Sequence, residues 1–192
     1  MNGSSILLLG GIRYSPRKDK IMDNFNLCWF LMVHLFGAQP HHTSKSFQKR
    51  IIHAIPQKMN VCMRVANKAI ELGVDPVLAV SVAYHETRLR EGLTSHAGAK
   101  GALGVIPKYH CPKPYKKCDL IKAGIIAIEK FLERNKYDLC SALAQYNRGL
   151  KGKCKKGRSE YNYAQAVLKT MKKLNQFMSP AMCYDPDLEN GC

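Results

Sequence analysis

The chain has 192 residues, of which 46% are hydrophobic, and its 30 Lys and Arg outnumber 14 Asp and Glu, for a net charge of +16. The hydrophobic share excludes a fully disordered chain, and the sequence lacks the run of about 18 apolar residues that predicts a conventional membrane-spanning helix. The charge indicates an anionic partner, a description that fits nucleic acid, acidic lipid and anionic cell wall equally.

Residues 1–38 form an N-terminal segment with the outline of a signal peptide. Basic residues precede the apolar run 27–36, and the small pair Gly37-Ala38 follows it. For a cleavage after Ala38, Phe36 would stand at position −3, where a small residue is usual. Met22 is an alternative start of translation. A buried helix or a virion-associated arm is the competing interpretation.

Residues 39–57 contain two prolines and three histidines and predict a polar linker. A folded domain is expected over 58–178, followed by a tail over 179–192. Apolar residues at helical spacing predict a first helix from Lys58, which Gly73 ends. Asp75-Pro76 is typical of an N-cap and a first helical residue, so a second helix is predicted over 77–90. Because it is apolar nearly all round, it should be buried.

The remaining segments also predict helices. The Gly- and Pro-rich stretch 91–117 predicts a loop, and 120–131 predicts a third helix. Asp138 is a suitable cap for a fourth helix over 139–146, and Ser159 can begin a fifth. No strand pattern and no internal repeat are evident, so the predicted fold class is mostly α.

Eight cysteines are dense for a chain of this size and favour an oxidising compartment. No Cys-x-x-Cys pair occurs, so disulfides are favoured over thiols and over zinc, and no metal is predicted. Proximity in the sequence predicts Cys111–Cys118 and Cys140–Cys154 disulfides. Cleavage after Ala38 would leave an odd number of cysteines. The eight are Cys28, Cys62, Cys111, Cys118, Cys140, Cys154, Cys183 and Cys192.

Glu86 is the outstanding candidate for chemistry, because it is the one acid in the apolar stretch 77–89. Burial disfavours an ionised carboxylate, and the C-terminal end of a helix dipole does the same. Both effects raise the pKa, as a general acid near neutral pH requires. The competing interpretation is a solvent-facing carboxylate paired with Arg88 or Arg90.

Three further segments follow Glu86 in order: Gly98-Ala99-Lys100-Gly101, Tyr146-Asn147-Arg148-Gly149 and Asn162-Tyr163. This order resembles the soluble-type (SLT) lytic transglycosylases, which are related to goose-type lysozyme. The resemblance covers roughly residues 58–176. Each motif is weak by itself, and the specificity comes from their order and spacing.

The resemblance implies a lysozyme-like helical domain with a sugar-binding groove. Such enzymes cleave the β-1,4 bond between N-acetylmuramic acid and N-acetylglucosamine and form a 1,6-anhydro product. By this resemblance Glu86 is the general acid and then the base, and no cofactor is needed. The implied substrate-binding residues are Thr87, Gly98, Ala99, Gly101, Tyr146, Asn147 and Tyr163.

The sequence departs from the family at two of these places. Thr87 stands where the family usually has Ser, and Gly104 stands where Gln is usual, which puts substrate contacts on that side in doubt. A second catalytic carboxylate, which typical glycosidases need, is not evident. Four acids on or beside predicted helices are expected to be surface charges: Asp119, Glu129, Glu133 and Asp138.

The expected partners are peptidoglycan strands and the anionic cell-wall surface. Residues 100–173 contain 18 Lys and Arg against 5 Asp and Glu, which suits such a surface. The protein is expected to be exported to the periplasm or cell wall, or to belong to a phage particle or to secretion or conjugation machinery. Hydrolytic muramidase action and an inactive wall-binding scaffold remain alternatives. A specific nucleic-acid partner is not expected, because no helix-turn-helix or zinc pattern occurs.

Overall fold

The computed structural model describes residues 24–33 and 45–177 of the chain. Within these residues it is mostly helical and contains no strand longer than an isolated bridge, which confirms the predicted class. The α-helices are α1 (Asn24–Leu31), α2 (Lys45–Glu71), α3 (Pro76–Thr87), α4 (Pro107–His110), α5 (Leu120–Arg134), α6 (Leu139–Arg148) and α7 (Ser159–Phe177). Two 3₁₀ turns are η2 (Tyr115–Lys117) and η3 (Gly149–Lys151).

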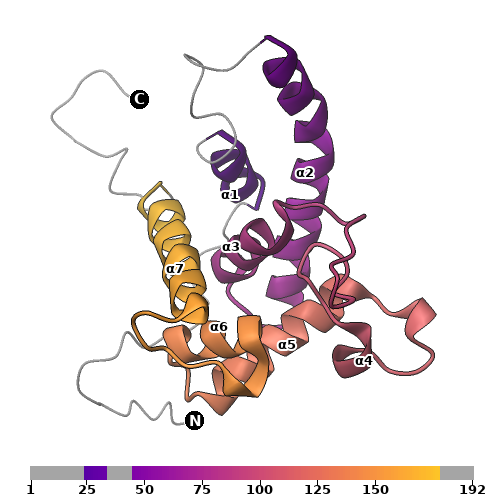
Figure 1. The fold of residues 1–192 in the computed structure, drawn as a ribbon. Coiled ribbons are helices and arrows are strands. Elements are labelled where there is room, and N and C mark those ends of the chain that lie inside the picture. The colour runs from indigo at the N-terminus through magenta and orange to yellow at the C-terminus, as the bar shows by residue number, and fades with distance from the viewer. Residues whose placement is uncertain (1–23, 34–44, 178–192) are drawn as a thin grey trace, which may run out of the picture.

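Helix α3 lies in the middle of the molecule, with α2 on one side and α7 on the other (Figure 1). The Asp75 side chain accepts a hydrogen bond from the backbone N–H of Val77, and Pro76 occupies the first turn, as predicted. Every residue from Pro76 to Ala83 is buried. A helix that is apolar all round is stable only inside such a cluster.

The predicted extension of this helix to residue 90 is wrong, because α3 ends at Thr87. Arg88 and Leu89 take left-handed backbone angles, with φ of 56° and 59°, which end the helix. The N–H of Arg88 bonds back to carbonyls of the last turn, and the Leu89 side chain turns into the core. Glu86 therefore lies in the final turn of α3, beside the loop that follows.

The predicted polar linker over 39–57 is wrong for residues 45–57, because α2 is continuous from Lys45 to Glu71. Its polar residues include Lys, Gln and Arg, which are good helix formers, and Pro56 does not interrupt the helix. Val61, Val65 and Ala69 are buried as expected, whereas Ile70 is half exposed.

Helix α1 covers part of the segment whose sequence has a signal-peptide outline. Leu27, Cys28 and Leu31 are fully buried, and Cys28 is disulfide-bonded to Cys62 of α2. Asn24 Nδ2 also donates a 2.6 Å hydrogen bond to Asn67 Oδ1. The buried-helix interpretation therefore describes Asn24–Leu31, while export stays a prediction. None of the helices in the described part of the chain is long and apolar enough to cross a membrane.

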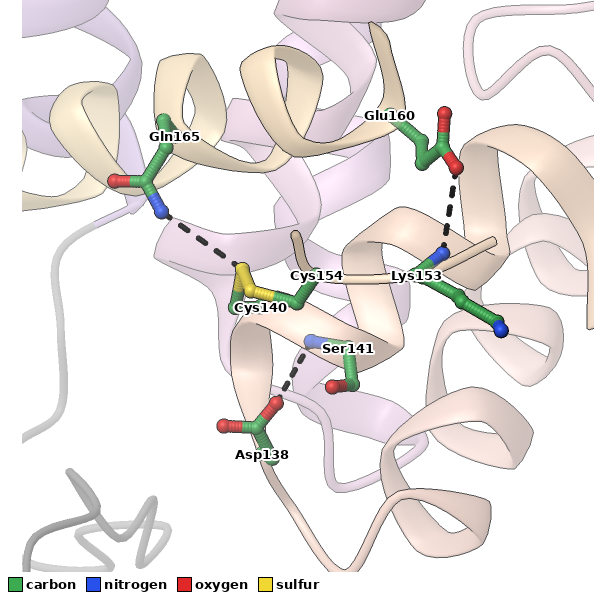
Figure 2. The surroundings of a disulfide bond; sticks show 7 residues. All are labelled: Asp138, Cys140, Ser141, Lys153, Cys154, Glu160 and Gln165. Atoms are coloured by element: carbon green, nitrogen blue, oxygen red, sulfur yellow. Dashed lines mark hydrogen bonds between the residues drawn. A yellow bond between two sulfur atoms is a disulfide. The ribbon is translucent and has the colours of Figure 1, made fainter. Parts of the chain in front are cut away.

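The predicted disulfides Cys111–Cys118 and Cys140–Cys154 are confirmed. Figure 2 shows the second, which ties the first turn of α6 to the segment before α7. Gln165 of α7 points its amide at Cys140 Sγ, with 3.8 Å between nitrogen and sulfur. Cys183 and Cys192 lie outside the described residues.

Glu160, in the first turn of α7, forms hydrogen bonds with the segment that precedes the helix. Its buried carboxylate accepts hydrogen bonds from Arg158 Nε at 2.8 Å and from Ser159 Oγ at 3.2 Å. It also accepts a 3.4 Å hydrogen bond from the backbone N–H of Lys153, which Figure 2 shows. The hydrogen bond from Arg158 is the main cause that lowers the pKa of Glu160 to about 2. A carboxylate in such a network stabilises the fold only while it is ionised.

We expect Glu160→Gln to lower the melting temperature at pH 7, and the difference from wild type to shrink as the pH falls from 4.5 towards 2. The sign follows because the folded-state pKa of about 2 lies below the ordinary value of 4.5. Thermal unfolding between pH 7 and pH 2 measures this, with the exposed Glu133→Gln as the control. Equal melting temperatures at pH 7 would contradict the stabilising role.

Candidate active site

Glu86 reaches the site from the last turn of α3, and Tyr163 reaches it from the second turn of α7. The Tyr163 hydroxyl donates a 2.6 Å hydrogen bond to Glu86 Oε1. The two helices pack against each other, so residues far apart in the sequence meet here (Figure 1). The hydrogen bond assigns one carboxyl oxygen to Tyr163 and leaves Oε2 as the oxygen available for other chemistry.

Burial raises the pKa of Glu86, and the hydrogen bond from Tyr163 offsets part of that effect. Burial, with the charge of Glu86, raises the pKa of Tyr163 well above its ordinary value, so the phenol keeps its proton and remains the donor. His85 is half-buried, and its desolvation is the main cause that lowers its pKa to about 4. The imidazole is therefore neutral near pH 7 and adds no charge beside Glu86.

The competing interpretation of Glu86 as half of a surface ion pair does not describe this structure. Arg88 lies over the Tyr84 ring, 4.2 Å from its centre, and donates to the Tyr84 carbonyl. Arg90 donates through Nε to the Thr87 carbonyl. Within the described residues no salt bridge involves Glu86.

Glu86 lines a cavity of about 230 Å³. The loop 95–106 contributes one wall, and the other lining residues come from three helices: His110 from α4, Phe131 from α5, and Tyr146 and Asn147 from α6. Carboxyl, imidazole, phenol and amide groups thus line one concavity together with apolar side chains, a combination found at small-molecule sites.

Tyr146 is held rigidly in its wall. Its hydroxyl donates a 2.6 Å hydrogen bond to the Leu103 carbonyl, and its ring meets the edge of Phe131 with centres 6.3 Å apart. Burial raises the pKa of Tyr146 well above its ordinary value, and the charge of Glu86 adds to this. Asn147, the next residue, is exposed at the cavity wall and leaves its amide available to a ligand.

The loop opposite α6 is fastened to the end of α3 through Thr87. The Thr87 hydroxyl donates to the Ala102 carbonyl at 2.9 Å and accepts from the Arg90 N–H at 3.1 Å. Lys100 and Val105 close the loop on itself through two backbone hydrogen bonds of 2.7 and 2.9 Å. The hydroxyl that Thr87 shares with Ser is therefore used to position the loop.

The structure places the sequence-predicted site residues in three positions. Glu86, Ala99, Tyr146 and Asn147 line the cavity, and Tyr163 contacts Glu86 directly. Thr87, Gly98 and Gly101 are not among the lining residues. Gly101 has φ +71°, and a Cβ there would lie 3.0 Å from Leu120 Cβ, so this glycine serves the packing of the loop on α5.

Sequence reasoning missed His110 and Phe131 as lining residues. His110 lies in the irregular stretch 91–117, next to the Cys111–Cys118 disulfide, and no spacing pattern marks it. Burial is the main cause that lowers the pKa of His110, with Lys130 adding to it. The nearby disulfide is the one sequence signal that pointed to an ordered loop here.

No second carboxylate lines the cavity among the described residues. Asp119 and Asp138 instead cap α5 and α6, accepting from the N–H groups of residues 122 and 141. Glu129 accepts a 3.2 Å hydrogen bond from the Tyr137 hydroxyl, and Glu133 is exposed. Glu86 is thus the one carboxyl group at this site.

No protein-family model matches the chain, and comparisons with curated proteins and with solved structures also find no match.

Proposed function

We propose that this protein is a peptidoglycan lytic transglycosylase with a lysozyme-like helical domain, in which the cavity beside Glu86 is part of the sugar-binding groove. The observation that carries the proposal is a single, partly buried carboxyl group, with a raised pKa, in a cavity that Tyr146 and Asn147 also line. These residues belong to separate motifs that resemble the soluble-type family. Their meeting at one cavity supports a common role.

In the first step Glu86 acts as the general acid. Its Oε2 proton passes to the oxygen of the β-1,4 bond, and the bond from C1 of N-acetylmuramic acid to that oxygen breaks. N-acetylglucosamine leaves with a free 4-hydroxyl. The raised pKa of Glu86 keeps the proton available nearer neutral pH than an exposed carboxyl would. Asn147 and the rigid Tyr146 would hold the N-acetyl group of the cleaved sugar.

In the second step the Glu86 carboxylate acts as the base. It accepts the proton of the muramyl 6-hydroxyl as that oxygen bonds to C1, which closes the 1,6-anhydro ring and restores the acid. Because the nucleophile belongs to the substrate, this reaction does not require the second carboxylate of typical glycosidases. The arrangement of acids in the described structure suits this mechanism.

Hydrolysis by the same fold is the second candidate, and His110 favours it. Burial and Lys130 both lower the pKa of this imidazole, so it is neutral near pH 7 and able to accept a proton from water at the cavity wall. A hydrolase would leave reducing muramyl ends, whereas a transglycosylase leaves 1,6-anhydro ends.

The strongly basic surface would concentrate the enzyme on the anionic wall, as part of a phage particle, a secretion or conjugation machine, or an exported enzyme. The test is mass spectrometry of the fragments that the full chain releases from purified peptidoglycan. Anhydro-muramyl ends support the proposal, and reducing ends support the hydrolase. A folded protein that binds the wall but releases nothing would support the inactive scaffold.

Tyr163→Phe is expected to shift the alkaline limb of the pH–rate profile of peptidoglycan cleavage to higher pH. The hydroxyl stabilises the ionised form of Glu86, so its loss raises the pKa of the acid and keeps it protonated further up the pH scale. The measurement is the initial rate of fragment release as a function of pH. Tyr161→Phe, on the same helix, is the control, and an unchanged or lowered limb in Tyr163→Phe would contradict the role.

A further inference from the structure

The two oxygens of the Glu86 carboxyl group are not equivalent. Oε1 accepts the only proton that the Tyr163 hydroxyl can donate, so a protonated Glu86 bears its own proton on Oε2. The reactive oxygen of the proposed mechanism is therefore Oε2, and its position depends on what stands next to it.

Gly104 is the neighbour of Oε2. A Cβ at this residue would lie 2.4 Å from Oε2, 3.1 Å from Cδ and 3.4 Å from Cγ of Glu86. Real Cβ atoms essentially never come within 3.0 Å of another heavy atom. Any side chain at residue 104 would thus displace the carboxyl group from the place where Tyr163 holds it.

The backbone at Gly104 is held in place, so it cannot readily move to relieve a contact between a new Cβ and the Glu86 carboxyl group. Its φ of +60° is in the region that favours glycine, and its N–H donates a 3.1 Å hydrogen bond to the Gly101 carbonyl. The preceding Leu103 is fully buried, and its carbonyl accepts from Tyr146. The following Val105 is paired with Lys100 through two backbone hydrogen bonds. Both neighbours are therefore anchored.

We propose that Gly104 is a positioning residue for catalysis, whose missing side chain lets Glu86 keep its hydrogen bond to Tyr163 while Oε2 lies at the cavity wall. This inference rests on the proposed function for its catalytic consequence. It gives the departure from the family's usual Gln a physical consequence: in this chain a side chain at residue 104 would meet the Glu86 carboxyl group. The other interpretation is that Gly104 lacks a substrate contact that the usual Gln would make, in which case the substitution would weaken substrate binding.

The test uses three variants of the full chain. Gly104→Ala adds the colliding Cβ, and Gly104→Asn adds it with a residue that tolerates positive φ. Gly104→Gln restores the family's usual side chain. Gly73→Ala is the matched control, because Gly73 has φ +74°, lies away from the site and has nothing within 4 Å of where its Cβ would lie.

Each variant is assayed for release of peptidoglycan fragments and for the titration of Glu86, followed by carboxyl-carbon NMR and assigned with Glu86→Gln. All three Gly104 variants should lose at least tenfold in turnover, and their Glu86 titration should move to higher pH as the Tyr163 hydrogen bond is lost. Gly73→Ala should retain the wild-type turnover and titration. A rise in activity in Gly104→Gln, or unchanged titration in both Gly104→Ala and Gly104→Asn, would overturn the inference.

The two readouts separate this inference from the proposed function. If the wild-type protein releases no fragments while the Gly104 variants still shift the Glu86 titration, the transglycosylase proposal fails and the positioning of the carboxyl group stands. If the wild-type protein is active and the variants match it in both readouts, the positioning fails and the function stands.

Discussion

Glu86→Gln should lower the rate of peptidoglycan cleavage by about 10² to 10⁴-fold, the usual contribution of a positioned general acid. The amide oxygen of Gln can still accept the hydrogen bond from Tyr163, so the site should keep its shape. Replacing the partly buried carboxylate by a neutral amide also removes the cost of its desolvation, so the melting temperature should be equal to that of the wild type or slightly higher. Quantitative mass spectrometry of released fragments measures the loss.

The control for this variant is Glu133→Gln, which removes one negative charge from an exposed position on α5. It should cleave at the wild-type rate, because Glu133 does not line the cavity. If Glu86→Gln kept more than about a tenth of the activity, Glu86 would be removed from the mechanism, since general acids contribute more than this. The anhydro ends should disappear together with the released fragments.

Removing the Cys28–Cys62 disulfide by a double serine replacement should produce the largest loss of stability among the three bridges found in residues 24–33 and 45–177. The bridge spans 34 residues, and the chain-entropy relation gives a loss of about 4 kcal/mol for that length. In a domain of this size that corresponds to a melting temperature lower by about 8 to 16 °C. Thermal unfolding of the oxidised full chain measures it.

The other bridges provide matched controls of shorter span. Cys140–Cys154 spans 14 residues and Cys111–Cys118 spans 7, for which the same relation gives losses of about 3 and 2 kcal/mol. The expected order of destabilisation therefore follows the spacing. If removal of Cys28–Cys62 left the melting temperature unchanged, α1 would not be bound to the domain in the way described.

The bridge also bears on the export prediction. A cleavage after Ala38 would remove Cys28 together with the buried residues Leu27 and Leu31, and would leave Cys62 without this partner. Peptide mapping under non-reducing conditions detects the Cys28–Cys62 link directly. Its presence in the mature protein would place the cleavage of a signal peptide before Cys28 rather than after Ala38.

The sequence by itself determined the helical class, two N-terminal capping signals and two disulfides. Asp75 and Asp138 cap α3 and α6, as predicted, because capping acts over a few neighbouring residues, and Ser159 is the first residue of α7. Two cysteine pairs could be predicted because each is close in the sequence. Glu86 stood out because a lone acid in an apolar helix is visible without any tertiary structure.

Only the tertiary structure decided how these pieces meet. The end of α3 at Thr87 depends on Leu89 turning into the core, and the burial of α1 depends on its contacts with α2 and α7, neither of which local propensity can show. His110 and Gly104 line the cavity but belong to the irregular stretch 91–117, whose sequence has no periodicity from which their positions could be predicted. The sequence identified Glu86, Tyr146 and Asn147 as site residues, and packing across distant segments decided that one oxygen of Glu86 accepts from Tyr163 while the other lies beside Gly104.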